Sequence, residues 1–390
     1  MSIITTTEQL SSLCERLSNV DYITIDTEFI REKTYWAKPC LIQLGHNSKA
    51  TAIDILTADL DLAPIFQLMR NKKIMKVFHA ARQDLEIFYK LMGEIPTPIF
   101  DTQISAMVCG FGDSVSYENL ILKLLNRPID KASRFTDWER RPLSQRQIDY
   151  ALADVTHLCE AYEKLLMQIE LSGRRSWLKE EIDALIAPAS YENNPYEAYK
   201  KIKSRNPDQK TMVVLRELAA WRENIAKQIN VPRNRVIKDM TLLEIAHQRP
   251  LTIEELKYTR GLPPKSIHGD RGKEIISAIK FGLNLPKSKW PSLPKKTKLP
   301  RGVGPITDLL KVLLKMRCED YGVASRLIAS ASDIELIAGY GETADVSAFK
   351  GWRREIFGND AIRLLRAEIA LAAGKSKVRT VDLPKVTNNK

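Results

Sequence analysis

The chain has 390 residues, which predicts two or three domains, each large enough to bury its own core. It shows no basic start followed by an apolar run and no stretch near the roughly 20 apolar residues that span a bilayer. We therefore expect a cytoplasmic protein with no secretory signal and no membrane contact. Its five cysteines are scattered and form no C-x-x-C pair, which favours free thiols over a zinc site.

Charge is divided unevenly along the chain. Residues 1–200 carry 23 Lys and Arg against 28 Asp and Glu, a net charge of −5, whereas residues 201–390 carry 37 against 20, a net charge of +17. This division indicates that the basic half holds a polyanion on which the acidic half acts. A basic surface that only promotes solubility is the alternative that charge alone leaves open.

The first half alternates between predicted strands and helices. Three strands with short connections are expected at 21–29, 40–46 and 50–55 as an antiparallel meander. The remaining elements are an amphipathic stretch at 60–70, an apolar run at 73–79, a strand at 97–100, and helices at about 80–92, 102–110, 116–125 and 144–171. This order predicts an α/β domain with a mixed sheet over residues 1–190.

The second half is predicted to be helical. Residues 188–208 contain three prolines and are expected to be a linker. They lead to a small all-α domain at 208–285. A second linker at 285–305 has five prolines, six Lys or Arg and no acid, so it should be extended and positively charged. A second helical block at about 306–373 belongs to a domain at 303–374, and 375–390 is expected to be a disordered basic tail.

The first candidate site lies in the predicted strand YITIDTEFI, residues 22–30. Asp26 and Glu28 share one face of that strand, roughly 6.6 Å apart along it. Two carboxylates among apolar residues repel each other and resist desolvation. A divalent cation makes the arrangement favourable, and oxygen ligands suit magnesium or manganese. A D-x-E without function on an edge strand is the alternative for this motif alone.

Two further motifs place acids at positions that favour the same chemistry. Asp84 follows His79 at a strand-to-helix junction, where an acid is also a favoured neighbour of the helix N-terminus. Tyr150 and Asp154 are four residues apart and share one helix face. Carboxylates that hold two divalent ions form the known device for in-line attack on a phosphodiester.

In this order the three motifs resemble those of the DEDDy family of exonucleases. The stretches TYWAKPCLIQLG, FHAARQDLEIF and DKASRFTDWERRPLSQRQIDYALADVTHL look like bacterial ribonuclease D, and the resemblance covers about residues 20–170. It implies a ribonuclease H-like fold and a 3′-to-5′ exoribonuclease that releases 5′-mononucleotides. LRELAAWRENIAKQINVPRNR, from residue 215, resembles an HRDC domain, a helical nucleic-acid-binding module, and 306–373 is similar to a divergent second one. A protein-interaction bundle is the alternative for both.

The resemblance also implies roles for the motif residues. It assigns Asp26 to both of two divalent ions, Mg²⁺ or Mn²⁺, with Glu28 and Asp154 completing the nucleophile-side site and Asp84 serving the second ion. Tyr150 has a reference pKa near 10, so we expect its hydroxyl to orient the attacking water rather than to act as a base. These five residues are the predicted catalytic set.

Substrate contacts are expected around this set. Phe29 looks like the apolar wedge of the family against the terminal base, with a plain core phenylalanine as the alternative. His79 and Gln83 are expected near the terminal sugar. The loop 126–143 interleaves cations with aromatic rings, which suits single-stranded RNA. Its candidates are Lys131, Trp138 and Arg141, with Trp138 as a plug of the domain core as the alternative.

The expected partner is RNA, and precursors of tRNA with 3′ trailers follow from the resemblance alone. We expect a monomer. Two other functions stay open: a DNA-directed DEDDy exonuclease, and a non-catalytic RNA-binding protein with vestigial acids. The absence of an attached polymerase disfavours the first, and the presence of all five motif residues disfavours the second.

Overall fold

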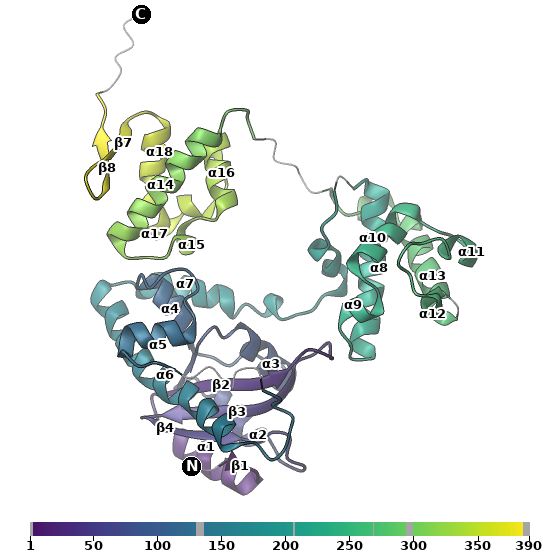
Figure 1. Ribbon diagram of the computed structural model, residues 1–390, viewed down its shortest axis with the longest axis horizontal. Helices are drawn as coiled ribbons and strands as arrows, with labels where there is room; N and C mark the ends of the chain where they lie inside the picture. Colours follow the sequence, from purple (N-terminus) through teal and green to yellow (C-terminus); the bar gives the residue numbers. More distant parts are fainter. Residues whose placement is uncertain (1–2, 130–135, 206, 268, 294–298, 385–390) are drawn as a thin grey trace, which may run out of the picture.

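The computed structural model describes residues 3–129, 136–205, 207–267, 269–293 and 299–384. Figure 1 shows a sheet flanked by helices in the N-terminal half and two separate helical blocks beside it. Within the described ranges, no helix combines the length and the apolar composition that crossing a membrane requires.

The N-terminal domain is built on a six-stranded sheet in the order β1–β4–β3–β2–β5–β6. The predicted meander is confirmed, because β3 pairs antiparallel with both β2 and β4. The outer strands β1, β5 and β6 pair in parallel, so the sheet is mixed, as the order of elements predicts. The strands are β1 (Ile3–Ile4), β2 (Tyr22–Ile30), β3 (Lys38–His46), β4 (Lys49–Ile53), β5 (Met75–Phe78) and β6 (Ile99–Asp101).

Helices cover the sheet, and the longest of them, α6, crosses it in Figure 1. The helices are α1 (Thr7–Leu17), α2 (Ala63–Arg70), α3 (Arg82–Met92), α4 (Thr102–Val108), α5 (Tyr117–Leu125), α6 (Gln145–Ser172) and α7 (Arg175–Leu185). A capping box starts α6: the Ser144 side chain accepts from the Gln147 backbone, and the Gln147 side chain accepts from the Ser144 backbone. The sequence predicted neither β1, α1 nor α7.

The segment 188–208, predicted to be a linker, is packed instead. It contains two short 3₁₀ helices, η1 (Pro188–Ser190) and η2 (Pro195–Lys201). Ala198, Tyr199 and Ile202 are buried in the core of the first helical block. Prolines and turn formers predicted a linker here. These three apolar side chains are nevertheless buried, and burying them offsets the entropic cost of ordering the chain.

The first helical block has its own core, in which Leu218, Ile245 and Ile279 are fully buried. Tyr35, from the loop between β2 and β3, belongs to the same core. The elements of the block are α8 (Gln209–Gln228), α9 (Arg233–Val236), α10 (Asp239–Gln248), α11 (Ile253–Leu256), α12 (Pro264–Ile267), α13 (Asp270–Asn284) and η3 (Lys287–Lys289).

The second helical block packs on the C-terminal end of α4, whose Met107 and Val108 lie in its core. In Figure 1 it stands above α4 and α7, apart from the first block. Its elements are α14 (Gly304–Tyr321), α15 (Ser325–Ile328), α16 (Ala331–Tyr340), η4 (Gly341–Thr343), η5 (Ser347–Phe349), α17 (Gly351–Arg353), η6 (Arg354–Gly358, a π-helical turn) and α18 (Asn359–Leu365).

The predictions for the C-terminus were wrong in part. The helices end at Leu365, and a hairpin of β7 (Ile369–Ala373) and β8 (Val378–Asp382) follows where a helix to 373 and a disordered tail from 375 were expected. Ile369 is 2% exposed, and Leu371 and Val378 pack against the core of the second block. The basic composition of the tail concealed these anchors, and backbone pairing with β7 orders the strand that carries Val378. Residues 385–390 lie outside the described part.

Candidate active site

Three predicted acids meet at the end of the sheet. Asp26 and Glu28 lie on β2, and Asp154 lies on α6. One carboxylate oxygen from each of the three lies within 4.8 Å of the other two. Strand β2 pairs with β5 only as far as Thr24, so both acids lie beyond the end of that pairing, and a shift in the register of β2 against β3 follows Glu28. The strand therefore presents two carboxylates to the third.

The close approach of α6 to the sheet brings Asp154 into this group. The hydroxyl of Thr24 on β2 donates to the carbonyl of Val155 at 2.8 Å. Gly45 on β3 makes room for this contact, because a Cβ there would lie 2.4 Å from the Thr24 hydroxyl and 3.0 Å from the Val155 carbonyl. The hydroxyl of Tyr117 donates to the carbonyl of Asp154 itself. These two hydrogen bonds thus hold α6 at Asp154 and at the residue that follows it.

Asp84 reaches the same site from the first turn of α3. It is 7% exposed, and Thr27, between the two acids of β2, donates to its Oδ1 at 2.5 Å. The turn before α3 places Ala80 in the left-handed region, with φ of 56°, which is strained for a residue with a side chain. Asp101 at the end of β6 holds that turn by accepting from the backbone of Ala80 at 3.2 Å and of Ala81 at 2.8 Å.

The site disfavours negative charge in the absence of a cation. Burial raises the pKa of Asp26 to about 6. Burial, and then the charge of Asp26, raise the pKa of Asp84 well above its usual range. Burial, and then the charge of Asp154, also raise the pKa of Tyr150, so that this hydroxyl stays protonated at neutral pH. The group is therefore one whose charge a bound cation would relieve.

These residues line one cleft of about 920 Å³. All five predicted catalytic residues, Asp26, Glu28, Asp84, Tyr150 and Asp154, contribute to its lining. A polyanion would reach this acidic group only together with neutralising cations.

Comparisons with known proteins agree with this geometry. Residues 1–170 match the family model described as 3′-5′ exonuclease, and residues 212–279 match the HRDC domain model. Ribonuclease D of Jannaschia sp. (strain CCS1) is 45% identical over 384 residues, 97% of this chain and 99% of the relative. Ribonuclease D of Granulibacter bethesdensis is 43% identical over 381 residues, 97% and 96% of the two chains. The chain belongs to the ribonuclease D family.

Similarity to a solved structure supports the same family assignment. The crystal structure of Escherichia coli RNase D, described as an exoribonuclease involved in structured RNA processing, has a TM-score of 0.79 and 29% identity to this chain. The match covers 94% of this chain and 98% of that one. The predicted fold class and the predicted activity are confirmed: the chain is a 3′-to-5′ exoribonuclease of the ribonuclease D family.

The structure places four of the predicted substrate residues in the cleft of this exoribonuclease: Phe29, His79, Gln83 and Trp138. Burial lowers the pKa of His79, whose Nδ1 lies 3.0 Å from the Thr102 hydroxyl. Its Nε2 is buried and has no hydrogen-bond partner among the described residues. Trp138 is 3% exposed and belongs to an apolar cluster with Leu152, so it plugs the domain core and also forms part of the cleft wall.

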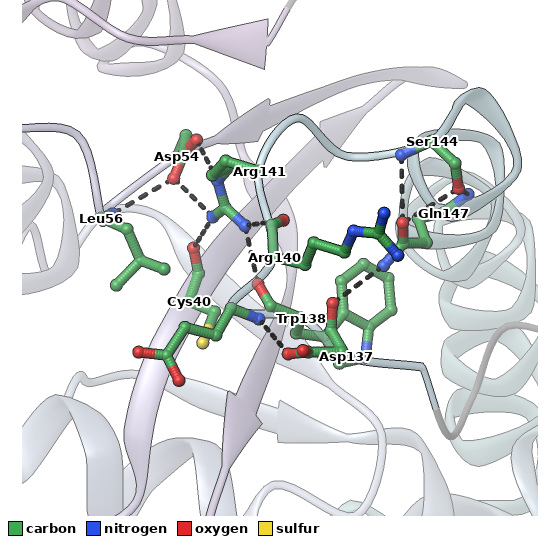
Figure 2. A network of polar contacts seen from close by, with 10 residues as sticks. Cys40, Asp54, Leu56, Asp137, Trp138, Arg140, Arg141, Ser144 and Gln147 are labelled. Atoms are coloured by element: carbon green, nitrogen blue, oxygen red, sulfur yellow. Dashed lines mark hydrogen bonds and ion pairs between the residues drawn. The ribbon is translucent and has the colours of Figure 1, made fainter.

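The structure does not bring Arg141 to the cleft. Figure 2 shows the guanidinium of Arg141 between Asp54 and the carbonyls of Cys40 and Trp138. It makes two hydrogen bonds of 2.6 Å to the Asp54 carboxylate and does not line the cleft. The ion pair with Asp54 accounts for the position of Arg141 and fixes the loop that carries Trp138. Lys131 lies outside the described residues.

Two residues at the site were missed by the sequence analysis. Asp101 holds the turn before Asp84, and its only signal was an acid directly after the strand at 97–100. Gln43 lies opposite Asp26 in the pairing of β2 with β3 and is fully buried. Neither atom of its amide has a hydrogen-bond partner among the described residues. A glutamine inside the apolar run CLIQLG was the available signal.

Proposed function

We propose that this exoribonuclease hydrolyses the 3′-terminal phosphodiester of RNA with two divalent ions, Mg²⁺ or Mn²⁺, and releases 5′-mononucleotides. The observation that carries the proposal is the group of Asp26, Glu28 and Asp154, with carboxylate oxygens within 4.8 Å of one another. Asp84, hydrogen-bonded to Thr27 beside them, is the fourth proposed ligand. Hard oxygen donors are the ligands that these two metals prefer.

The donor set fits such ions. Burial raises the pKa of Asp26 and of Asp84, and the charge of Asp26 raises the pKa of Asp84 further, so two ionised carboxylates are disfavoured here. When bound, a pair of divalent ions lowers the pKa of a water and stabilises the departing 3′ oxygen. The residues of the chain hold the ligands in place: Thr24 and Tyr117 fix α6 around Asp154, and Asp101 fixes the turn before Asp84.

Tyr150 is proposed to orient the attacking water. It lies one helical turn before Asp154, and both line the cleft. Because its pKa is raised, the hydroxyl keeps its proton at neutral pH and acts as a hydrogen-bonding group, not as the base.

The other cleft residues are proposed to bind the terminal nucleotide. His79 lines the cleft and is uncharged at neutral pH because burial lowers its pKa, so it can lie against the terminal ribose without attracting phosphate. Gln83, one residue before Asp84, is exposed in the cleft and is proposed to bind the same sugar. Phe29 is half-buried beside Glu28 and offers an apolar face to the terminal base.

We also propose the setting in which the enzyme works. Its substrates are tRNA precursors with 3′ trailers, it acts as a monomer, and it resides in the cytoplasm. The exonuclease domain spans residues 1–190, the first HRDC domain 208–285, and a second, HRDC-like domain 303–374. The +17 charge of residues 201–390 supports RNA binding by the C-terminal half.

The test is an exonuclease assay on 3′-labelled RNA and on DNA of the same sequence, with Mg²⁺, with Mn²⁺ and with EDTA. We expect labelled 5′-mononucleotides from RNA with either metal and none with EDTA. A preference for DNA would favour the DNA-directed alternative. Mononucleotide release that persists in EDTA would contradict the metal mechanism.

A further inference from the structure

A second cavity, of about 430 Å³, lies beside the acidic cleft. It is formed where three parts of the chain meet: the loop after β2 with Arg31 and Thr34, the start of α3 with Arg82, and the first helical block with Arg233. Lys201, the last residue of η2, closes it from the packed segment between the two domains. No catalytic role proposed above uses this cavity.

The lining of this cavity is cationic. Arg31, Arg82, Lys201 and Arg233 contribute four positive charges, and Glu86 is the one acid among the described residues that line it. Glu86 is already engaged, because it accepts two hydrogen bonds of 2.8 Å from Arg31. The residues that line the cavity therefore carry a net charge of +3, of which Glu223 beside Arg233 offsets one, next to a catalytic half whose net charge is −5.

Two arginines that line this space, Arg82 and Arg233, use only some of their donors in the contacts found among the described residues. Arg82 donates from one terminal nitrogen to the Ser190 carbonyl at 2.8 Å, and its guanidinium lies 4.8 Å from the centre of the Tyr191 ring. Arg233 reaches Glu223 at 3.1 Å through one nitrogen. A guanidinium carries five N–H donors, so both side chains are held in place with donors to spare. Such preorganised forks match the oxygens of a phosphate.

The cavity adjoins the cleft. Arg31 and Thr34 line both spaces. Arg82, in the cavity, directly precedes Gln83, in the cleft. An RNA strand whose 3′ nucleotide lies at the acidic group thus has its next phosphates within reach of this cationic junction.

We propose that this cavity binds backbone phosphates of the RNA upstream of the nucleotide being removed. The inference rests on the proposed function and deepens it, since it names where the exonuclease domain and the first helical block hold the substrate together. The contacts are to phosphate, so they tolerate any base sequence. They also require several nucleotides, so they distinguish a long RNA from a dinucleotide.

Two neighbouring lysines allow a matched test. Lys201 lines the cavity and is exposed. Lys200, the preceding residue of η2, is equally exposed, pairs with Glu197 and does not line the cavity. Lys201→Ala and Lys200→Ala therefore remove the same charge from adjacent positions, and neither side chain is needed for the packing of η2.

The measurement compares kcat/KM for a dinucleotide with kcat/KM for a longer single-stranded RNA, in the full chain. For Lys201→Ala and for Arg82→Ala we expect the preference for the longer RNA to fall about tenfold, the scale of losing one hydrogen bond to a charged group. The slope of log affinity for the longer RNA against log salt should decrease by about 0.7 for each phosphate that the variant no longer neutralises. Lys200→Ala should retain both the preference and the slope.

The remaining outcomes would each overturn either the cavity as a phosphate site or the proposed function. Equal losses for Lys200→Ala and Lys201→Ala would show a diffuse charge effect and overturn the cavity as a site. An unchanged length preference and salt slope in both cavity variants would overturn it as well. If the unaltered chain released no mononucleotides from either substrate, the proposed function would fail, which is a result distinct from both. Thermal melting of each variant confirms that the fold is retained.

Discussion

The two helical blocks contact the exonuclease domain in different ways. The first block holds the loop between β2 and β3: the hydroxyl of Tyr35 donates to the buried Glu223, and the backbone of Trp36 donates to Asn230 at 3.3 Å. That loop also carries Arg31 and Thr34, which line the cleft. The first block is therefore attached directly to a wall of the active site.

The second block is attached to α4 and α7 instead. Trp352 stacks on Trp177 with ring centroids 4.2 Å apart, and Arg353 pairs with Glu180 and Glu181. None of these contact residues lines the cleft. This block reaches the cleft edge through Arg326, which donates to Ser114 at 2.9 Å. The difference indicates that disturbing the first block alters substrate binding, and that disturbing the second alters mainly stability.

The largest effect is expected from a substitution that leaves the contacts of both helical blocks intact. Asp26→Asn should reduce mononucleotide release below detection, because it removes a carboxylate from the centre of the acidic group. It should also raise the melting temperature of the metal-free protein, since it relieves the repulsion that raises the pKa of Asp84. Mg²⁺ should then stabilise the variant less than the unaltered chain.

The matched control for this variant is Asp21→Asn, an exposed acid directly before β2 that does not line the cleft. It should retain both turnover and the response of the melting temperature to Mg²⁺. Turnover by Asp26→Asn close to that of the control would exclude Asp26 as a ligand and leave the chemistry unassigned.

Tyr150→Phe tests the cleft without removing a charge. Turnover should fall by a factor of about 10²–10⁴, the scale of losing a positioned proton-transfer or water-orienting group. RNA affinity should barely change, since the cationic residues are untouched. Tyr162→Phe, a buried tyrosine on the same helix outside the cleft, is the control. Full turnover by Tyr150→Phe would make Tyr150 a packing residue.

What the sequence predicted well is encoded locally. The strands around Asp26, the helix with Tyr150 and Asp154, and the junction before Asp84 each follow from a residue pattern within one element and its neighbours. The spatial meeting of these motifs came from the family resemblance, and the structure brings all five residues to one cleft. The elements that carry the five residues were therefore predictable from the sequence, whereas the distances between their side chains came only from the structure.

What the sequence did not predict depends on partners far along the chain. Arg141 was assigned to RNA because it lies in a basic, aromatic loop, yet its partner Asp54 is 87 residues away. The hydroxyl of Tyr35 donates to Glu223, which is 188 residues away along the chain. Strand β8 was predicted to be part of a tail because its two valines, Val378 and Val381, are three residues apart and do not show the two-residue period of a strand. Such contacts have no local signature.

Trp352→Ala tests the second attachment. Trp352 is 7% exposed, and truncating a buried tryptophan costs about 3–5 kcal/mol of unfolding free energy. We expect a lower melting temperature or a separate early transition for the second block, with kcat on a dinucleotide near that of the unaltered chain. A large loss of kcat without a loss of stability would mean that this block acts on the cleft after all.

Tyr35→Phe tests the first attachment and has the smallest expected effect. Removing its hydroxyl takes a hydrogen bond from Glu223, which keeps Arg233 at 3.1 Å, so unfolding should become easier by about 1–2 kcal/mol. The loop with Arg31 and Thr34 loses one support, so KM for RNA should rise a few-fold while kcat changes little.

Tyr196→Phe, an exposed tyrosine on η2, is the control. In the double variant with Glu223→Ala the combined stability loss should be smaller than the sum of the two single losses, because both substitutions remove the hydrogen bond between Tyr35 and Glu223. Additive losses, or a KM equal to that of the control, would show that the first block does not position this wall of the cleft.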